Sequence, residues 1–98
     1  GNTLELDKMS VVVVTPPVDD ADILVSVDGA HVYTFTVTAA GGVTLPAVPP
    51  VVPVGRVSFF SPASTLNLRV SIPAIHHTHI DMVPELGNYV QEFERARE

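Results

Sequence analysis

The side chains best suited to chemistry lie close together in the last quarter of the chain. His76, His77, His79 and Asp81 fall within six consecutive residues. If this segment is a β-strand, alternate residues share a face, so His77, His79 and Asp81 point the same way. Two imidazoles and a carboxylate suit a divalent cation. The spacing therefore indicates a candidate metal site at His77, His79 and Asp81, and a divalent metal held there is the one cofactor that the sequence suggests.

A second interpretation of this cluster needs no metal. The histidines are then surface residues of a strand without a ligand, because a protein metal site usually draws its ligands from several parts of the fold. His31 is the only other histidine in the chain. It can complete a metal site only if its own strand pairs with the strand that carries His79.

Three short motifs in the cluster resemble motifs of known families. His79-Ile80-Asp81 resembles the HxD motif of iron-dependent dioxygenases, but these also need a distal C-terminal histidine, and none follows His79. His76-His77-Thr78 is similar to one half of the paired HxT motif of two-histidine phosphoesterases, and the chain has no second copy. His77-Thr78-His79 is similar to the HxH of trimeric phage spike and fibre tips. That resemblance implies a metal enclosed by three chains.

Other catalytic or binding motifs are incomplete. Asp19, Asp20 and Asp22 form an acidic turn that either binds calcium between loops or stays solvated. The chain has no cysteine, which excludes a thiolate nucleophile, a disulfide framework and a cysteine-based zinc site. Its serines lie in no strand-turn-helix elbow, and Gly41-Gly42 opens no helix as a phosphate-binding loop does. The sequence therefore predicts a protein that is not an enzyme.

The charges of the chain are few and unevenly distributed. Its 98 residues carry a net charge of −6, with five basic residues against eleven acidic ones. This balance cannot build the positive surface that nucleic acids or anionic membranes require, so we expect neither as a partner. Between Asp28 and Asp81 only Arg56 and Arg69 carry a permanent charge. That middle is either a compact β core with exposed Thr and Ser or a surface buried against neighbouring subunits.

The residue types and their alternation predict an all-β fold. Val, Ile and Thr fit a pleated sheet better than a helix. We expect strands at residues 3–6, 10–15, 23–27, 31–38, 43–45, 56–61, 65–72 and 74–80. Asp28-Gly29 is a strong signal for a two-residue hairpin turn. Tyr33, Phe35 and Val37 share one face of their strand and should point to the core. The apolar run from Ser10 to Thr15 predicts burial on both faces or an edge covered by a partner.

Short strands at this spacing predict a single domain, residues 1–98, folded as an antiparallel β-sandwich or small barrel. One short α-helix at about residues 85–97 should close it, because Leu86, Tyr89 and Phe93 recur at helical spacing. The proline-rich segment 46–53 should be extended, polyproline-like chain. Its PxxP spacing also suits polyproline-binding domains. Its aliphatic neighbours favour a strap between subunits.

The sequence as a whole favours a non-enzymatic structural or assembly subunit that acts through protein–protein contacts. Its expected partners are other protein subunits, in a homo-oligomer or a larger assembly, with a virion or a surface appendage as the setting. A virion or the extracellular cell surface is therefore the expected location. The alternative is a metal-binding module built on His77 and His79, with a trimeric tip as one form of it.

Overall fold

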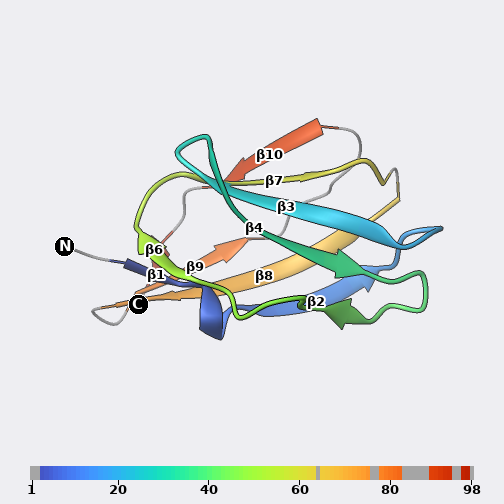
Figure 1. Ribbon diagram of the computed structural model, residues 1–98, viewed down its shortest axis with the longest axis horizontal. Coiled ribbons are helices and arrows are strands. Elements are labelled where there is room, and N and C mark those ends of the chain that lie inside the picture. The colour runs from blue at the N-terminus through green and yellow to red at the C-terminus, as the bar shows by residue number, and fades with distance from the viewer. Residues whose placement is uncertain (1–2, 64, 76–77, 83–88, 94–95, 98) are drawn as a thin grey trace.

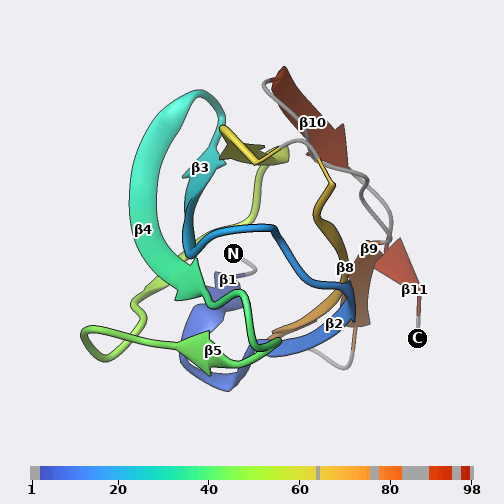
Figure 2. The same cartoon turned by 90° about the vertical axis from the view of Figure 1, so that its right-hand side faces the viewer.

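The computed structural model describes residues 3–63, 65–75, 78–82, 89–93 and 96–97. Within them the chain forms two antiparallel β-sheets that face each other, as Figures 1 and 2 show. One 3-10 helix, η1 (Leu6–Lys8), interrupts the first sheet between its first two strands. The predicted all-β class is confirmed.

Each sheet combines strands that lie far apart in the sequence. Sheet A runs in the order β11 (Ala96–Arg97), β9 (Thr78–Met82), β8 (Asn67–Ala74), β1 (Thr3–Glu5) and β6 (Val51–Pro53), and β2 (Ser10–Thr15) also pairs with β8. Sheet B runs in the order β10 (Tyr89–Phe93), β7 (Val57–Ser61), β3 (Ala21–Val27), β4 (Ala30–Val37) and β5 (Val43–Thr44). The N-terminal strands thus lie in the same sheet as β8 and β9.

The core lies between the two sheets and contains the residues that alternate along the central strands. On β4, Tyr33, Phe35 and Val37 are buried, and the predicted core face is confirmed. The same holds for the apolar series that leads into and along β8, which contributes Leu66, Leu68, Val70 and Ile72. Among the residues that the structure describes, the other fully buried large side chains are Leu4, Leu6, Ile23, Val25, Val57 and Phe59. Period-two burial from both sheets is what a β-sandwich requires.

The turn between β3 and β4 is the two-residue hairpin that the sequence predicts. Asp28 and Gly29 both have positive φ angles, 52° and 82°, and Val27 pairs with Ala30 across them. Positive φ at both central residues matches the right-handed twist of the strands. The Asp28 carboxylate also accepts a hydrogen bond from the Arg56 N–H at 3.0 Å, and its own N–H donates to the Arg56 carbonyl at 2.8 Å. These bonds join the hairpin tip to the chain just before β7.

The predicted C-terminal helix at about residues 85–97 is wrong. The described parts of that segment are strands: β10 pairs with β7 from Tyr89↔Ser61 to Phe93↔Val57, and β11 pairs with β9. Aromatic and β-branched residues such as Tyr89, Val90 and Phe93 suit a strand. A helix of about a dozen residues is marginal in water by itself, whereas β10 takes up the backbone groups along one edge of β7. The available sheet edge therefore outweighs the helical spacing.

Candidate functional site

The proposed metal ligands are described only in part. His77 lies outside the described residues, as does His76. His79 and Asp81 lie two positions apart on β9, where His79 pairs with Pro73 and Asp81 with Ser71. The expected strand at 74–80 is thus correct only in its second half, because Ala74 ends β8 and pairs with Thr78, where β9 begins. The metal site itself stays a prediction.

His31 does not lie on a strand next to β9. Its strand, β4, pairs with β3 and β5 in sheet B, whereas β9 pairs with β8 and β11 in sheet A. The His31 Nε2 lies 2.7 Å from the Thr34 hydroxyl on the same strand. Among the described residues, no group of three or more His, Asp or Glu side chains is arranged to hold a metal ion. The pairing that would let His31 complete the cluster is thus not formed.

The acidic turn between β2 and β3 borders a surface hollow of about 440 Å³. Two carboxylates of the acidic turn accept hydrogen bonds from neighbouring segments. Asp20 Oδ1 accepts a hydrogen bond from the Ala39 N–H at 2.9 Å, and Asp22 Oδ1 accepts one from the Thr36 hydroxyl at 3.0 Å. Both bonds hold the turn against β4 and the loop that follows it. The geometry fits the interpretation of a solvated, structural turn.

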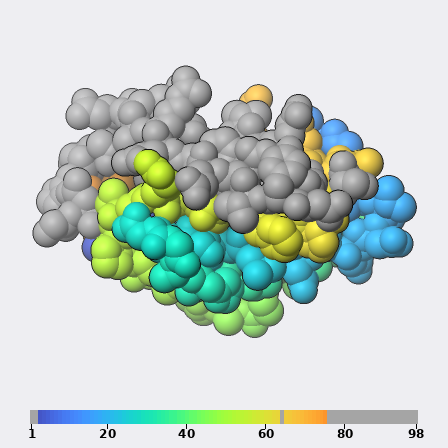
Figure 3. All heavy atoms as spheres, turned by 90° about the horizontal axis from the view of Figure 1, so that it is seen from above, coloured from blue at the N-terminus to red at the C-terminus, as the bar shows by residue number. Residues whose placement is uncertain are grey.

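The largest run of exposed apolar side chains lies between β4 and β7. We call residues 43–54 the strap; it includes β5, the proline-rich segment 46–53 and β6. It contains no charged residue, and Thr44 is its one polar side chain. Val48 is 86% exposed and Val51 is 51% exposed, and Val43, Leu45 and Val54 are exposed as well. Figure 3 shows green strap atoms at the surface beside the teal atoms of β4.

The strap connects the two sheets and is attached at three points. Its first residues form β5, which pairs with β4 at Thr36↔Thr44 in sheet B. Its last part forms β6, which pairs with β1 at Leu4↔Val52 in sheet A. Between them, the Tyr33 hydroxyl donates a hydrogen bond of 2.6 Å to the Ala47 carbonyl. Of the expected polyproline-like segment 46–53, residues Val51–Pro53 are a paired β-strand, and the chain bends at Pro46 and Ala47.

Some residues of the strap face inward and are buried or half-buried. Val52 is half-buried and packs against the core, and Pro49 is buried. Val48, Val51 and Val54 are the exposed residues of the same segment. Inner and outer residues alternate where the strap forms β6, as in any half-buried strand. The two sides can therefore be changed independently.

A second apolar surface lies on β2. Val12 and Val14 are each 55% exposed, although they belong to the continuous apolar run that predicted burial or a covered edge. β2 pairs with β8 alone among the described strands, so its other edge is open. Of the two alternatives that the sequence left for this run, burial on both faces is thus wrong.

Comparisons with known proteins add no functional information. No protein-family model, curated protein or solved structure matches this chain. In the described part of the chain, no helix has the length and apolar character needed to cross a membrane. The surface of the molecule is therefore the basis for a functional proposal.

Sequence reasoning missed how the strap is held. It treated residues 46–53 as polyproline-like chain between subunits, whereas β6 adds a strand to sheet A and the Tyr33 hydroxyl binds the middle of the strap. One signal was present: Tyr33 stands on a core face, and a buried tyrosine hydroxyl needs a hydrogen-bond partner. The identity of that partner, a carbonyl fourteen residues away, is set by the fold.

Proposed function

We propose that this protein is a non-enzymatic assembly subunit that docks onto neighbouring protein subunits through the strap. One observation carries the proposal: twelve consecutive residues without a charge lie across the side of the sandwich, fixed to both sheets, with most of their apolar side chains in water. Contiguous exposed apolar surface on a folded domain marks an interaction site. A virion or a surface appendage is the setting that we propose.

The attachment of the strap favours docking because it reduces the entropic cost of binding. A loose proline-rich loop would lose conformational freedom on contact with a partner. In this protein the strap is already ordered, because β5 pairs with β4, β6 pairs with β1, and the Tyr33 hydroxyl donates a hydrogen bond to Ala47. Burial of an exposed valine contributes up to about 1.5 kcal/mol at 25 cal/mol per Å². Several such side chains together suffice for a specific contact.

The low charge of the strap supports a protein partner rather than a polar ligand. The cores of protein interfaces are depleted of charged residues, as this segment is. A site for a small charged substrate would instead need oriented polar groups. The proposal thus names protein subunits as partners, either copies of this chain or other chains of the same assembly.

A double substitution on the outer side of the strap tests the proposal. In Val48→Ser with Val51→Ser, we expect the subunit contact to weaken about tenfold or more, because two exposed apolar anchors are lost. Circular dichroism and thermal unfolding should match the parent protein, because neither side chain belongs to the core. The measurement is sedimentation velocity across a micromolar concentration series. Val18→Ser is the matched control, because Val18 is 76% exposed but lies outside the strap.

Two results would contradict the proposal. The first is a sharp monomer throughout the concentration series together with no partner in the native source. The second is unfolding of the double variant, which would show that the outer valines stabilise the fold rather than an interface. Loss of the contact from Val18→Ser alone would place the interface at the acidic turn instead.

A further inference from the structure

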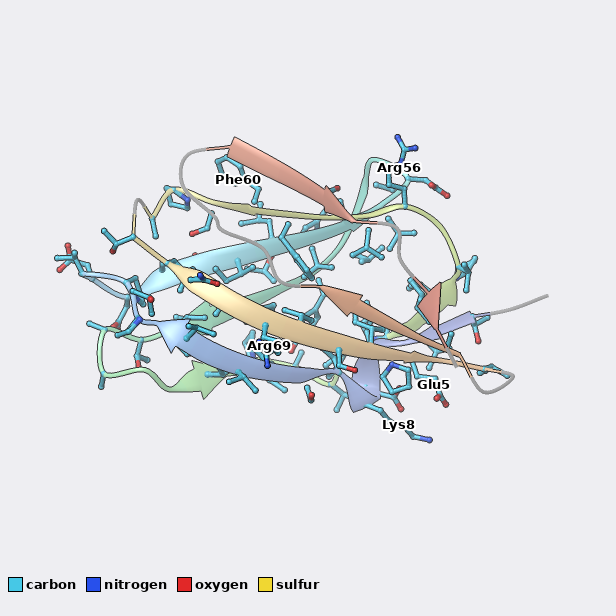
Figure 4. All side chains as sticks on the ribbon, turned by 180° about the vertical axis from the view of Figure 1, so that it is seen from behind. Glu5, Lys8, Arg56, Phe60 and Arg69 are labelled. Atoms are coloured by element: carbon cyan, nitrogen blue, oxygen red, sulfur yellow. The ribbon has the colours of Figure 1, made fainter. Side chains whose placement is uncertain are left out.

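The open edge of β2 differs from the other strand edges at the ends of the sheets. β2 pairs with β8 along one side, and within the described residues no strand pairs with its other side. Figure 4 shows β2 at the border of sheet A, next to β8 and Arg69. Its six residues, Ser-Val-Val-Val-Val-Thr, include no charge and no proline. An edge of this length presents a row of backbone donors and acceptors to an incoming strand.

The other terminal strands in the described part of the chain carry features that discourage strand addition. β5 and β11 have two residues each. β6 has three and ends in Pro53, which offers no N–H. β10 has five residues and includes the acidic residue Glu92. Short length, proline and charge are among the ways in which natural proteins protect sheet edges. β2 has none of these three, and its pairing with β8 is regular from Ser10 to Val13, with a register shift only between Val13 and Thr15.

The core beneath β2 is also incomplete. Val11 and Val13 are the inward-facing residues of this strand and pack against the core, but both remain only half-buried. The corresponding apolar residues of β8, such as Leu68 and Val70, are fully buried. A further strand beside β2 would cover Val11 and Val13 from the side. Within the described residues, the open edge thus lacks a backbone partner, and its inward-facing side chains are only partly covered.

We propose that a second copy of this chain adds its own β2 to this edge, antiparallel and about a two-fold axis, so that sheet A continues across both subunits. This inference rests on the proposed function and assigns one of the assembly contacts. Directly opposite residues in an antiparallel pair point to the same face, so residues of equal parity must pair. The register that covers both half-buried valines places Val11 opposite the partner's Val13 and Val12 opposite the partner's Val12.

The charges around β2 permit such a self-contact. The strand itself is neutral, so two copies meet without like charges opposite each other. Arg69 lies opposite Val12 on β8. The two copies of Arg69 would be three strand spacings apart, about 14 Å, which exceeds the screening length of physiological salt. The exposed Lys8, just before β2, would come near the partner's acidic turn, because antiparallel strands bring the start of one beside the end of the other.

The position of β5 gives the partner a second contact. In Figures 1 and 2, β5 of sheet B lies near β2 on the same side of the molecule. A copy joined at β2 therefore also faces the start of the strap. An interface that is the same patch on both subunits is the form that two-fold symmetry requires.

Val12→Glu tests the contact because it has opposite effects in the monomer and in the dimer. Within one chain the new carboxylate lies across from Arg69, which favours the folded monomer. In the proposed dimer it lies opposite the same carboxylate of the second copy. We expect the parent protein to form dimers in sedimentation velocity and the Val12→Glu variant to dimerise at least about tenfold more weakly. Val18→Glu, at an exposed site away from β2, should dimerise as the parent does.

Charge complementation checks that the loss comes from pairing and not from misfolding. Val12→Lys alone should also be monomeric, whereas an equal mixture with Val12→Glu should form dimers again, because lysine and glutamate then face each other. Circular dichroism of both variants should show the β spectrum of the parent. Failure of the mixture to form dimers would overturn the proposed contact.

Single cysteines test the register, since the chain has no cysteine of its own. Opposite residues in antiparallel strands have Cα atoms about 4.5–5.5 Å apart, within the range of a disulfide. We therefore expect Val12→Cys to form a disulfide-linked dimer on mild oxidation. In Val14→Cys, the cysteine would face the partner's Ser10. The two cysteines would then be four residues apart along the strand direction, about 13 Å, and should not cross-link. Equal cross-linking of both variants, or none of Val12→Cys, would overturn the register.

The outcomes separate this inference from the proposed function. If the assembly is lost in the strap variant Val48→Ser with Val51→Ser but unchanged in Val12→Glu, the β2 contact is wrong and the assembly role stands. If the parent chain is monomeric at all concentrations and its native source contains no partner, both the β2 contact and the assembly role are wrong. Loss of dimers in Val12→Glu with rescue by Val12→Lys supports the β2 contact specifically.

Discussion

At the scale of single residues, the hydroxyl of Tyr33 determines where the middle of the strap lies. The ring is almost fully buried on β4, and its oxygen donates to the Ala47 carbonyl at 2.6 Å. That one bond joins a core residue to a surface segment. No other hydrogen bond among the described residues holds the strap between β5 and β6, so the position of Val48, the exposed valine between these two strands, depends on this contact.

Removal of this hydroxyl should loosen the strap and leave the core intact. In Tyr33→Phe the ring remains, so we expect a loss of about 0.5–1.5 kcal/mol in the free energy of unfolding from the missing hydrogen bond. Hydrogen exchange of the Leu45, Ala47 and Val48 amides should become faster, while exchange in β3 and β7 stays unchanged. If the strap exchanges as before, its order comes from strand pairing alone. Tyr33→Leu, which removes the ring as well, should cost more because it leaves a cavity.

At the scale of elements, the β3–β4 hairpin depends on a backbone conformation that few residues adopt. Gly29 has a φ of 82°, and an added Cβ at this position would meet no other atom within 4 Å. Any effect of substitution there therefore reports backbone strain and not crowding. The hairpin matters beyond itself, because Asp28 at its tip binds the backbone of Arg56 before β7.

Two substitutions at Gly29 distinguish backbone strain at the positive φ angle from the loss of glycine's conformational freedom. We expect Gly29→Ala to lower the free energy of unfolding by about 1–2 kcal/mol, since a left-handed conformation is costly for alanine. Gly29→Asn should cost clearly less, because asparagine tolerates this region and is frequent in such turns. Chemical denaturation with urea measures both. Equal losses in the two variants would show that strain at this φ angle is not the cause.

At the scale of the whole molecule, the distribution of charge sets the expected response of the assembly to salt. The net charge is −6, but the strap and β2 are neutral. Attraction between subunits must then come from apolar burial and backbone pairing, while the acidic residues elsewhere repel one another. Salt screens that repulsion over distances of about 8–10 Å and leaves the apolar contacts in place.

We therefore expect association of the subunits to stay the same or strengthen as sodium chloride is raised from a low to a near-molar concentration. Sedimentation velocity of the parent protein at several salt concentrations measures this. Dissociation at high salt would show that ion pairs hold the assembly, contrary to the proposed strap and β2 contacts. Lys8, just before β2, and Arg69, opposite Val12 on β8, would then be the first to substitute.

Local pattern by itself determined much of this protein. The β-branched composition, the alternation through Tyr33, Phe35 and Val37, and the Asp28-Gly29 turn each act over a few neighbouring residues, and the structure confirms them. These features depend on side-chain periodicity and turn sterics, which do not need distant partners. The same pattern left open whether the charge-poor middle of the chain is a compact β core or a surface buried against other subunits.

Tertiary structure alone decided what depends on residues far apart in the sequence. The segment around Tyr89 and Phe93 has helical spacing but becomes a strand because β7 offers it an edge. Pairing of Leu4 with Val52 makes the strap part of sheet A, and separation of β4 from β9 keeps His31 away from the strand of His79. Which edges are filled and which stay open, as at β2, is a property of the complete sheets. Backbone hydrogen-bonding groups are alike in every residue except proline, so local sequence pattern does not specify which strands they will join.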